Sequence, residues 1–329
     1  MPRAIGLPLH HRIIHLEPML RIIATRIVQI IVTLWLASTL VFVMIHLSGD
    51  PTQGFLPPGV SPELREQMRQ KLGLDDPMLQ QYLRFIGRGF TGDFGDSWRD
   101  GRPALESVLN RLPATLQLTG AALLLAVVTG FGFALLMQRP SRFRQVLALL
   151  PSFGQAVPTF WLGAMLMMIF AVRAGWLPSS GNHSAAAIIL PALTLALHPA
   201  STIARLFATS MEDVTHADYV RTARSKGLSQ RAVTTHHIAP NALLPTVAYI
   251  GLQAGFLIGG AVVVESLFAW PGVGRLALQS AVQRDLPVVH AFVAVTALGV
   301  IGINLLVDLI QVVIDPRLRS HTIQAVANG

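Results

Sequence analysis

Long apolar runs alternate with short charged stretches along the whole chain. A helix needs about 20 consecutive, mostly apolar residues to cross a hydrocarbon core of about 30 Å. About six runs have this character and predict transmembrane helices, which cover residues 27–47, 114–137, 146–172, 185–204, 242–264 and 287–314. The pattern predicts an all-α, polytopic membrane protein.

Internal prolines interrupt two of these runs. Pro151 and Pro158 fall in the third run, and Pro191 and Pro199 fall in the fourth. A proline kinks a helix, but inside a membrane neighbouring helices can satisfy the freed backbone groups. We therefore expect each of the two runs to form one kinked span.

The first run, residues 27–47, has two interpretations because a basic segment with Arg12, Arg21 and Arg26 precedes it. Such a segment also begins a secretory signal peptide. The apolar part of a signal peptide has roughly 7–15 residues and is followed by a small-residue cleavage site. This run is longer and no such site follows it, which favours an uncleaved helix.

Composition supports the membrane interpretation and limits the alternatives. Only 13% of the 329 residues are charged, about half of the roughly 25% found in soluble domains. The formal net charge of +8 does not indicate nucleic-acid binding, because the basic residues lie between apolar runs and not on one soluble face. Cysteine is absent, which excludes disulfides and thiolate metal sites within this chain.

The basic residues also predict the orientation. They cluster before the first run, after the second, after the fourth and after the sixth: Arg3, Arg12, Arg21, Arg26; Arg139, Arg142, Arg144; Arg221, Arg224, Lys226, Arg231; Arg317, Arg319. Lys and Arg concentrate in cytoplasmic loops, so both termini are expected in the cytoplasm. The predicted parts are a cytoplasmic N-terminal segment (1–26), the first transmembrane helix (27–47), an extracytoplasmic loop (48–112), a core transmembrane domain (113–314) with a cytoplasmic loop near 209–240, and a cytoplasmic tail (315–329).

The extracytoplasmic loop has the pattern of two short amphipathic helices. Ser61 is suited to cap the first, with Pro62 at its first position and Gly73 at its end. The second is expected to start near Asp76-Pro77 and to stop before Gly87. These helices could contact the membrane, a partner or a delivered substrate. Equally, they could form a packed lid without a ligand.

The loop near 209–240 predicts a well-ended helix outside the bilayer. Asp218 in its first turn and Lys226 in its last turn both suit the helix dipole, and Gly227 suits the left-handed position after the end. Ser229 can cap a second helix that runs through His237.

Tyr219 and Ala223 of this helix share one side, which predicts docking into a groove on another protein. Anchoring of the basic helix to acidic lipid is the alternative that the residues leave open.

This loop resembles the coupling loop of binding-protein-dependent ABC importer permeases, especially the dipeptide, oligopeptide and nickel branch. The resemblance rests on residues 218–223, 226–228, His237 and 241–245, and on further segments along nearly the whole chain: 73–77, 92–97, 111–116, 160–163, 175–178, 265–272, 306–308 and 315–317. Arg221 and Thr222 stand where other branches of the family have Glu and Ala, as is common in the peptide branch.

The resemblance implies the fold of type I ABC importer permeases and a location in the bacterial inner membrane. It implies a second homologous permease, two ABC ATPase subunits and an extracytoplasmic solute-binding protein as partners. The coupling residues that it implies are Asp218, Tyr219, Arg221, Ala223, Arg224, Lys226 and Gly227. ATP and Mg²⁺ would bind the ATPase subunits, and no cofactor is expected on this chain, which lacks a Walker sequence.

Small and polar residues within the spans are further candidates. Gly251, Gly255 and Gly259 repeat every fourth residue, which predicts close helix packing in the bundle or against the sister permease, or a lining of the path. Polar and ionisable residues at membrane depth are functional hypotheses, and this chain places Gln155, His198, His290, Asn304 and Asp308 in or near its spans.

Other functions are disfavoured by missing chemistry. A membrane-embedded enzyme would need a nucleophile with a base, or paired acids, and the sequence has neither Gly-x-Ser-x-Gly nor His-Glu-x-x-His. A proton-coupled carrier usually has buried acids in several spans. The histidines are not spaced as a metal site. We expect import of di- or oligopeptides, with glutathione and nickel chelates as alternative solutes.

Overall fold

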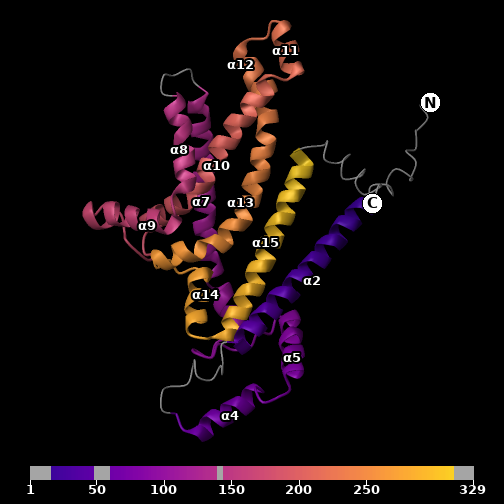
Figure 1. Ribbon diagram of the computed structural model, residues 1–329, viewed down its shortest axis with the longest axis vertical. Coiled ribbons are helices and arrows are strands. Elements are labelled where there is room, and N and C mark those ends of the chain that lie inside the picture. Colours follow the sequence, from indigo (N-terminus) through magenta and orange to yellow (C-terminus); the bar gives the residue numbers. More distant parts are fainter. Residues whose placement is uncertain (1–15, 48–59, 139–143, 315–329) are drawn as a thin grey trace, which may run out of the picture.

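The computed structural model describes residues 16–47, 60–138 and 144–314 (Figure 1). This described part of the chain folds into helices and has no β-strand. The long helices are α2 (Leu16–Leu47), α7 (Leu112–Met137), α10 (Ile189–Thr215), α13 (Ala239–Leu267) and α15 (Leu286–Ile314). The shorter elements are α4 (Pro62–Leu72), α5 (Met78–Thr91), α6 (Ala104–Leu109), α8 (Arg144–Ala156), α9 (Thr159–Leu166), η1 (Met167–Arg173), η2 (Ala185–Ile188), α11 (Asp218–Ser225), α12 (Gln230–Val233), η3 (Thr234–Ile238) and α14 (Val273–Val282).

Five helical stretches are long and apolar enough to cross a membrane. They cover 27–44, 104–137, 185–215, 230–267 and 286–307, and they correspond to the first, second, fourth, fifth and sixth predicted spans. The fourth forms a continuous helix although Pro199 lies inside it. The all-α, multi-span prediction is confirmed.

The third predicted span is not one helix. The chain bends by 97° between 149–156 and 159–173, so the expectation of a single kinked helix over 146–172 is wrong. The bend lies at Pro158, which precedes the first residue of α9 in an extended conformation. Proline disfavours a helical conformation in the residue before it and has no N–H to continue the helix. Pro151, in contrast, stays inside α8.

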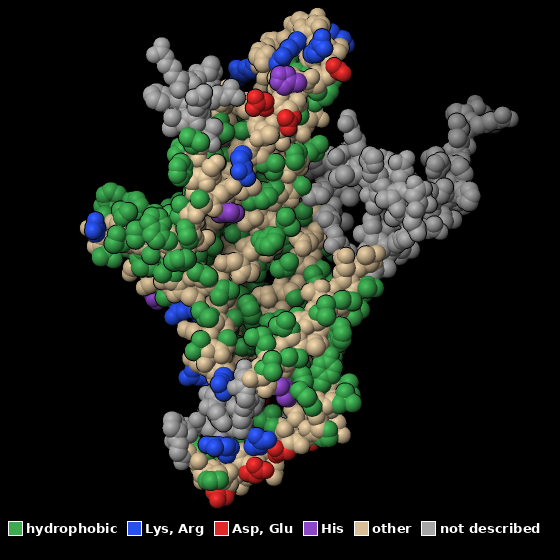
Figure 2. Space-filling view, in the orientation of Figure 1, with side chains coloured by type: hydrophobic (Ala, Val, Ile, Leu, Met, Phe, Trp, Pro, Cys, Tyr) green, Lys and Arg blue, Asp and Glu red, His purple; other side chains and the backbone are tan. Residues whose placement is uncertain are grey.

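The two ends of the bundle carry different elements (Figure 1). Helices α11 and α12 project at one end, whereas α4, α5 and α14 lie at the other. Helix α2 begins, and α15 ends, toward the end with α11. Most charged side chains gather at the two ends, and hydrophobic side chains cover much of the surface between them (Figure 2). The end with α11 and α12 is named the α11 end, and the end with α4, α5 and α14 is named the α5 end.

The bundle core forms where α7, α10 and α13 pack together. Leu118, Leu190 and Leu257 are buried there, and Phe268 and Trp270 close the core beyond the end of α13. Glycine allows α7 and α10 to approach each other closely. A Cβ at Gly130 of α7 would lie 2.8 Å from the backbone oxygen of Ala200 on α10. A larger side chain at position 130 would therefore force the two helices apart.

Both amphipathic helices predicted in the loop after the first span are present. Ser61 accepts a hydrogen bond from the Leu64 backbone N–H, and Gly73 ends α4 in the left-handed conformation, with φ 65°. A backbone hydrogen bond at the start of α4 lowers the pKa of Glu63, assisted by the Ser61 side chain.

Helix α5, however, does not stop before Gly87. It continues to Thr91 and is ended by Gly92, with φ 75°. The glycine within it at position 89 has a packing role, because a Cβ there would lie 3.2 Å from the ring of His290 on α15.

Candidate functional site: the loop between α10 and α13

The loop between α10 and α13 forms a small helical unit at the α11 end (Figure 1). Gly227 follows α11 with φ 76°, and Ser229 caps α12 by accepting a hydrogen bond from the Ala232 N–H at 3.3 Å. A π-helical turn, η3, then joins α12 to α13 without a break. The predicted short helix, its glycine end and the capped second helix are therefore confirmed.

Two side chains of α11 hold it against the bundle. Val220 is fully buried and Ala223 is 5% exposed. They pack in an apolar cluster with Phe207 of α10, Val233 of α12 and Ile238 of η3. Residues three apart lie on one side of a helix, so this pair fixes how α11 is rotated on its support.

This rotation corrects one prediction. The sequence predicts that Ala223 shares an open docking side with Tyr219, but Ala223 faces the cluster while Tyr219 is 45% exposed. Residues four apart lie roughly 40° apart around a helix axis, so the edge of the side that α10 and η3 cover falls between Tyr219 and Ala223. The open side of α11 is thus the side with Tyr219.

The open surface of this unit is basic with an apolar part. Its apolar residues are Tyr219 and Leu228, which is 44% exposed. Its basic residues are all exposed: Arg221, Arg224, Lys226 and Arg231. No carboxylate in the described part of the chain forms an ion pair with them. A rigid surface of this kind can bind an acidic groove with an apolar floor.

The three glycines of α13 have different environments. A Cβ at Gly251 would overlap the side chain of Val307, and one at Gly255 would lie 3.3 Å from the Asn304 amide oxygen. Both glycines therefore allow α15 to pack closely on α13. Gly259 is exposed, and a Cβ added there would have no atom within 4 Å. The predicted packing role holds inside this chain for the first two glycines and not for the third.

A matched pair of variants tests this difference. Gly251→Val is expected to lower the stability of the chain by about 1–3 kcal/mol, because the added side chain would force α13 and α15 apart. Gly259→Val adds the same atoms to the same helix in open space. Thermal unfolding of the detergent-solubilised protein should therefore show a lower Tm for the first variant alone. Equal Tm values for both variants would contradict the assigned packing.

Comparison with known protein families identifies the family of this chain. Residues 122–320 match the family described as the inner membrane component of binding-protein-dependent transport systems. Residues 19–119 match the N-terminal family of such membrane components. The chain belongs to this family. It is a permease subunit of an ABC importer in the inner membrane.

Curated relatives match this permease over almost their whole length. The glutathione transport system permease protein GsiC of Escherichia coli strain K12 is 39% identical over 307 residues, which is 92% of this chain and 99% of that protein. GsiC of Salmonella paratyphi A is 41% identical over the same shares. These relatives are transport permeases and not enzymes.

Solved structures support the fold. An inward-facing methionine ABC transporter, MetNI, matches with a TM-score of 0.52 and 18% identity, over 65% of this chain and 98% of that one. An amino acid ABC transporter crystallised with histidines matches with a TM-score of 0.51 and 17% identity, over 63% and 93%. At this identity the comparison establishes the type I permease fold.

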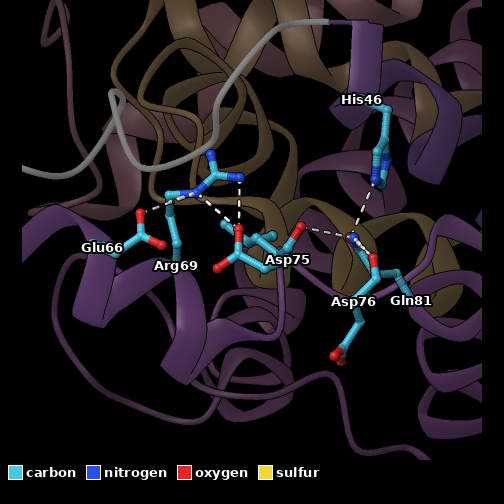
Figure 3. A network of polar contacts seen from close by, with 7 residues as sticks. His46, Glu66, Arg69, Asp75, Asp76 and Gln81 are labelled. Atoms are coloured by element: carbon cyan, nitrogen blue, oxygen red, sulfur yellow. Dashed lines mark hydrogen bonds and ion pairs between the residues drawn. The ribbon is translucent and has the colours of Figure 1, made fainter.

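At the α5 end of the permease, α4 and α5 are attached to the membrane helices. The side-chain amide of Gln81 donates to the backbone oxygens of Leu74 and Asp76, at 2.9 and 2.8 Å. Its amide oxygen lies 3.3 Å from Nε2 of His46, at the end of α2 (Figure 3). This single side chain joins the turn between α4 and α5 to the first membrane helix.

The same turn is stabilised by an arginine. Arg69 of α4 donates to Oδ1 of Asp75 from Nε at 3.1 Å and from Nη2 at 2.8 Å, and Glu66 lies 4.0 Å from its Nε (Figure 3). All three side chains are partly exposed, so each contact contributes little alone. Together with Gln81 they favour one geometry of the turn.

A second attachment involves a buried carboxylate that the sequence interpretation did not single out. Asp285, just before α15, is 3% exposed. Its two carboxylate oxygens accept hydrogen bonds from the Ser97 hydroxyl at 2.6 Å and from the Trp98 backbone N–H at 3.1 Å. Ser97 belongs to the segment 92–97, which carries part of the family resemblance, and this segment thus contacts the start of α15.

Glu265 is the most enclosed carboxylate in the described residues, with no exposed surface. It accepts hydrogen bonds from the Thr115 hydroxyl at 2.6 Å and from the Arg275 backbone N–H at 2.9 Å. Thr115 in turn accepts one from the Val273 N–H at 2.9 Å. This carboxylate therefore joins α13, α7 and α14. An acid in the last turn of a helix opposes the helix dipole, and that sequence signal could have identified it.

No group of three or more potential ligands among the described residues could hold a metal ion. His10, His11 and His15 lie outside the described residues. Of the intramembrane candidates, Gln155 contacts Thr202 and His290 contacts Ser38.

Proposed function

We propose that this permease forms the membrane path for short peptides or peptide-like solutes that a solute-binding protein delivers. Its partners in the proposed complex are a second, homologous permease and two ATPase subunits that hydrolyse ATP. The observation that supports coupling most directly is the unit around α11. Val220 and Ala223 fix it to the bundle, while Tyr219, Leu228 and four basic residues remain open for a partner.

Motion of such a unit would reach the spans because its support is continuous. Helix α10 leads into it, and α12, η3 and α13 lead out of it as successive helical segments. A packed helical unit moves as one body, since its side chains cannot rearrange without opening the cluster. Force applied by an ATPase at α11 would therefore act on both α10 and α13.

Cross-linking tests this coupling. Cysteine at position 219 should cross-link to an ATPase subunit in the assembled transporter, because Tyr219 lies on the open side. Cysteine at position 223 is the matched control on the same helix and should react poorly, because Ala223 is buried. Cross-links from position 219 to lipid alone would support membrane anchoring and contradict the proposal.

The relatives' names favour glutathione as the first solute to test. Glutathione is itself a tripeptide, so this choice narrows the peptide proposal. Uptake of radiolabelled glutathione, trialanine and a nickel–histidine chelate should be measured in cells that contain the complete transporter. Uptake of the nickel chelate without either peptide would overturn the peptide class and leave the nickel alternative.

A further inference from the structure

Helix α10 is the most enclosed membrane helix in the described part of the chain. Of the residues in its span, 56% are buried, against 17–33% in the other four spans. It packs against α7, α8, α9 and α13. The side that packs on these helices carries Ile203, Phe207 and Met211. The remaining side of α10 is exposed.

That open side is polar. His198, Thr202, Arg205 and Thr209 follow at intervals of four, three and four residues, so they form one stripe along the helix. Three of them are exposed and Thr202 is partly buried. Toward the α5 end the same side is covered by α9, where Gly163 lies against Thr194. The stripe is therefore exposed beyond the part of α10 that α9 covers.

Two neighbouring helices add polar groups to the stripe. The amide of Gln155 on α8 donates to the Thr202 hydroxyl at 3.0 Å, and that hydroxyl donates to the His198 backbone oxygen at 3.2 Å. Tyr249 of α13 lies against Thr202. Just after Gln155 the chain makes its 97° bend. Broken helices at membrane depth are found where they are buried in protein or line a water-filled cavity.

The stripe runs from the middle of α10 toward the α11 end. Thr202 is the central residue of α10, so it is roughly 20 Å from either helix end at about 1.5 Å per residue. Arg205 is one turn from it, about 5 Å along the axis. A cation at the centre of a span costs at least about 2.5–3.5 kcal/mol against lipid. Elsewhere in the bundle many exposed side chains are apolar, such as Leu40 and Val128, although Gln117 and Thr129 of α7 are exposed as well.

We propose that His198, Thr202, Arg205 and Thr209 form a wall of the translocation path, and that Arg205 binds a carboxylate of the passing solute. No carboxylate in the described residues pairs with Arg205, so its charge is available. A guanidinium recognises a carboxylate through two parallel hydrogen bonds. The assignment of Arg205 to a solute carboxylate rests on the proposed function, because peptides end in a carboxylate.

Thiol accessibility tests the wall. This chain has no cysteine, so Thr202→Cys and Thr209→Cys can be labelled without background from the permease. In inverted membrane vesicles that contain the assembled transporter, a charged methanethiosulfonate should modify both at least about tenfold faster than Leu40→Cys, since only hydrated thiols ionise and react. Equally slow modification of all three would mean that lipid or a subunit covers the stripe, and would overturn the wall.

Uptake measurements test Arg205. Arg205→Gln is expected to lower uptake of trialanine about tenfold through loss of a charge-assisted hydrogen bond, and to leave uptake of trialaninamide unchanged. Arg205→Lys retains the charge and should transport trialanine within a few-fold of the natural protein. An equal loss for both peptides would overturn the carboxylate site. If the natural transporter imports neither trialanine nor glutathione, the substrate class fails, whereas the thiol test still decides the wall.

Discussion

Gly227→Val is expected to leave the permease in the membrane but to lower solute uptake per ATP hydrolysed roughly 5–30-fold. Gly227 has φ 76°, and a left-handed conformation costs a residue with a Cβ about 1–2 kcal/mol. A cost of this size lowers the ratio of the native loop conformation to other loop conformations roughly 5–30-fold. The effect is on backbone geometry alone, because nothing lies within 4 Å of the added Cβ.

The measurement is uptake and ATP hydrolysis by the complete transporter in reconstituted vesicles. Gly101→Val provides the control, since Gly101 has φ 68° and also has nothing within 4 Å of a Cβ. Gly101 lies in the segment that is predicted to be extracytoplasmic, away from α11, so its substitution should produce the same backbone strain without a loss of coupling. Unchanged uptake in Gly227→Val, or an equal loss in both variants, would count against the role of the loop.

Glu265→Ala is expected to have the largest effect on stability. It removes the acceptor of the Thr115 hydroxyl and the Arg275 backbone N–H, which are left in an apolar interior. Hydrogen bonds to charged groups contribute about 1.5–3 kcal/mol each, so the loss of two is about 3–6 kcal/mol. The Tm of the purified protein should fall by more than about 5 °C.

Two variants make this prediction specific. Glu66→Ala removes a carboxylate that is 59% exposed and should change the Tm little. Gly272→Ala should destabilise the natural protein, because its Cβ would overlap the Glu265 carboxyl group, but should cost less in the Glu265→Ala background. Additive effects of the two substitutions would show that the contact is not made.

Hydrophobic run length predicted five of the spans because it reports directly on the bilayer, which imposes the same requirement on every spanning helix. Local capping chemistry likewise predicted α4 and the end of α11. Ser61, Gly73 and Gly227 act through their own backbone or through groups within a few residues. Such features do not depend on the rest of the fold.

The sequence pattern did not show that the third run breaks at Pro158 or that α5 continues beyond Gly87. Both Pro151 and Pro158 are prolines in one apolar run, yet only the second ends a helix. The sequence predicts that the second helix stops before Gly87, but α5 continues, and Gly89 admits the His290 ring. Sequence spacing does not show this contact, because it depends on which helix packs opposite.

The amino-acid sequence by itself determined the helical class, five of the spans, and the glycine-ended helix between the fourth and fifth predicted spans. Those features follow from solvation by the bilayer and from backbone propensities that act locally. Tertiary structure alone decided that Ala223 faces inward, that Gly251 and Gly259 differ, and that Glu265 joins three helices. Each of these depends on a partner more than 10 residues away or on the rotation of a helix about its axis, which a repeating apolar pattern fixes only coarsely.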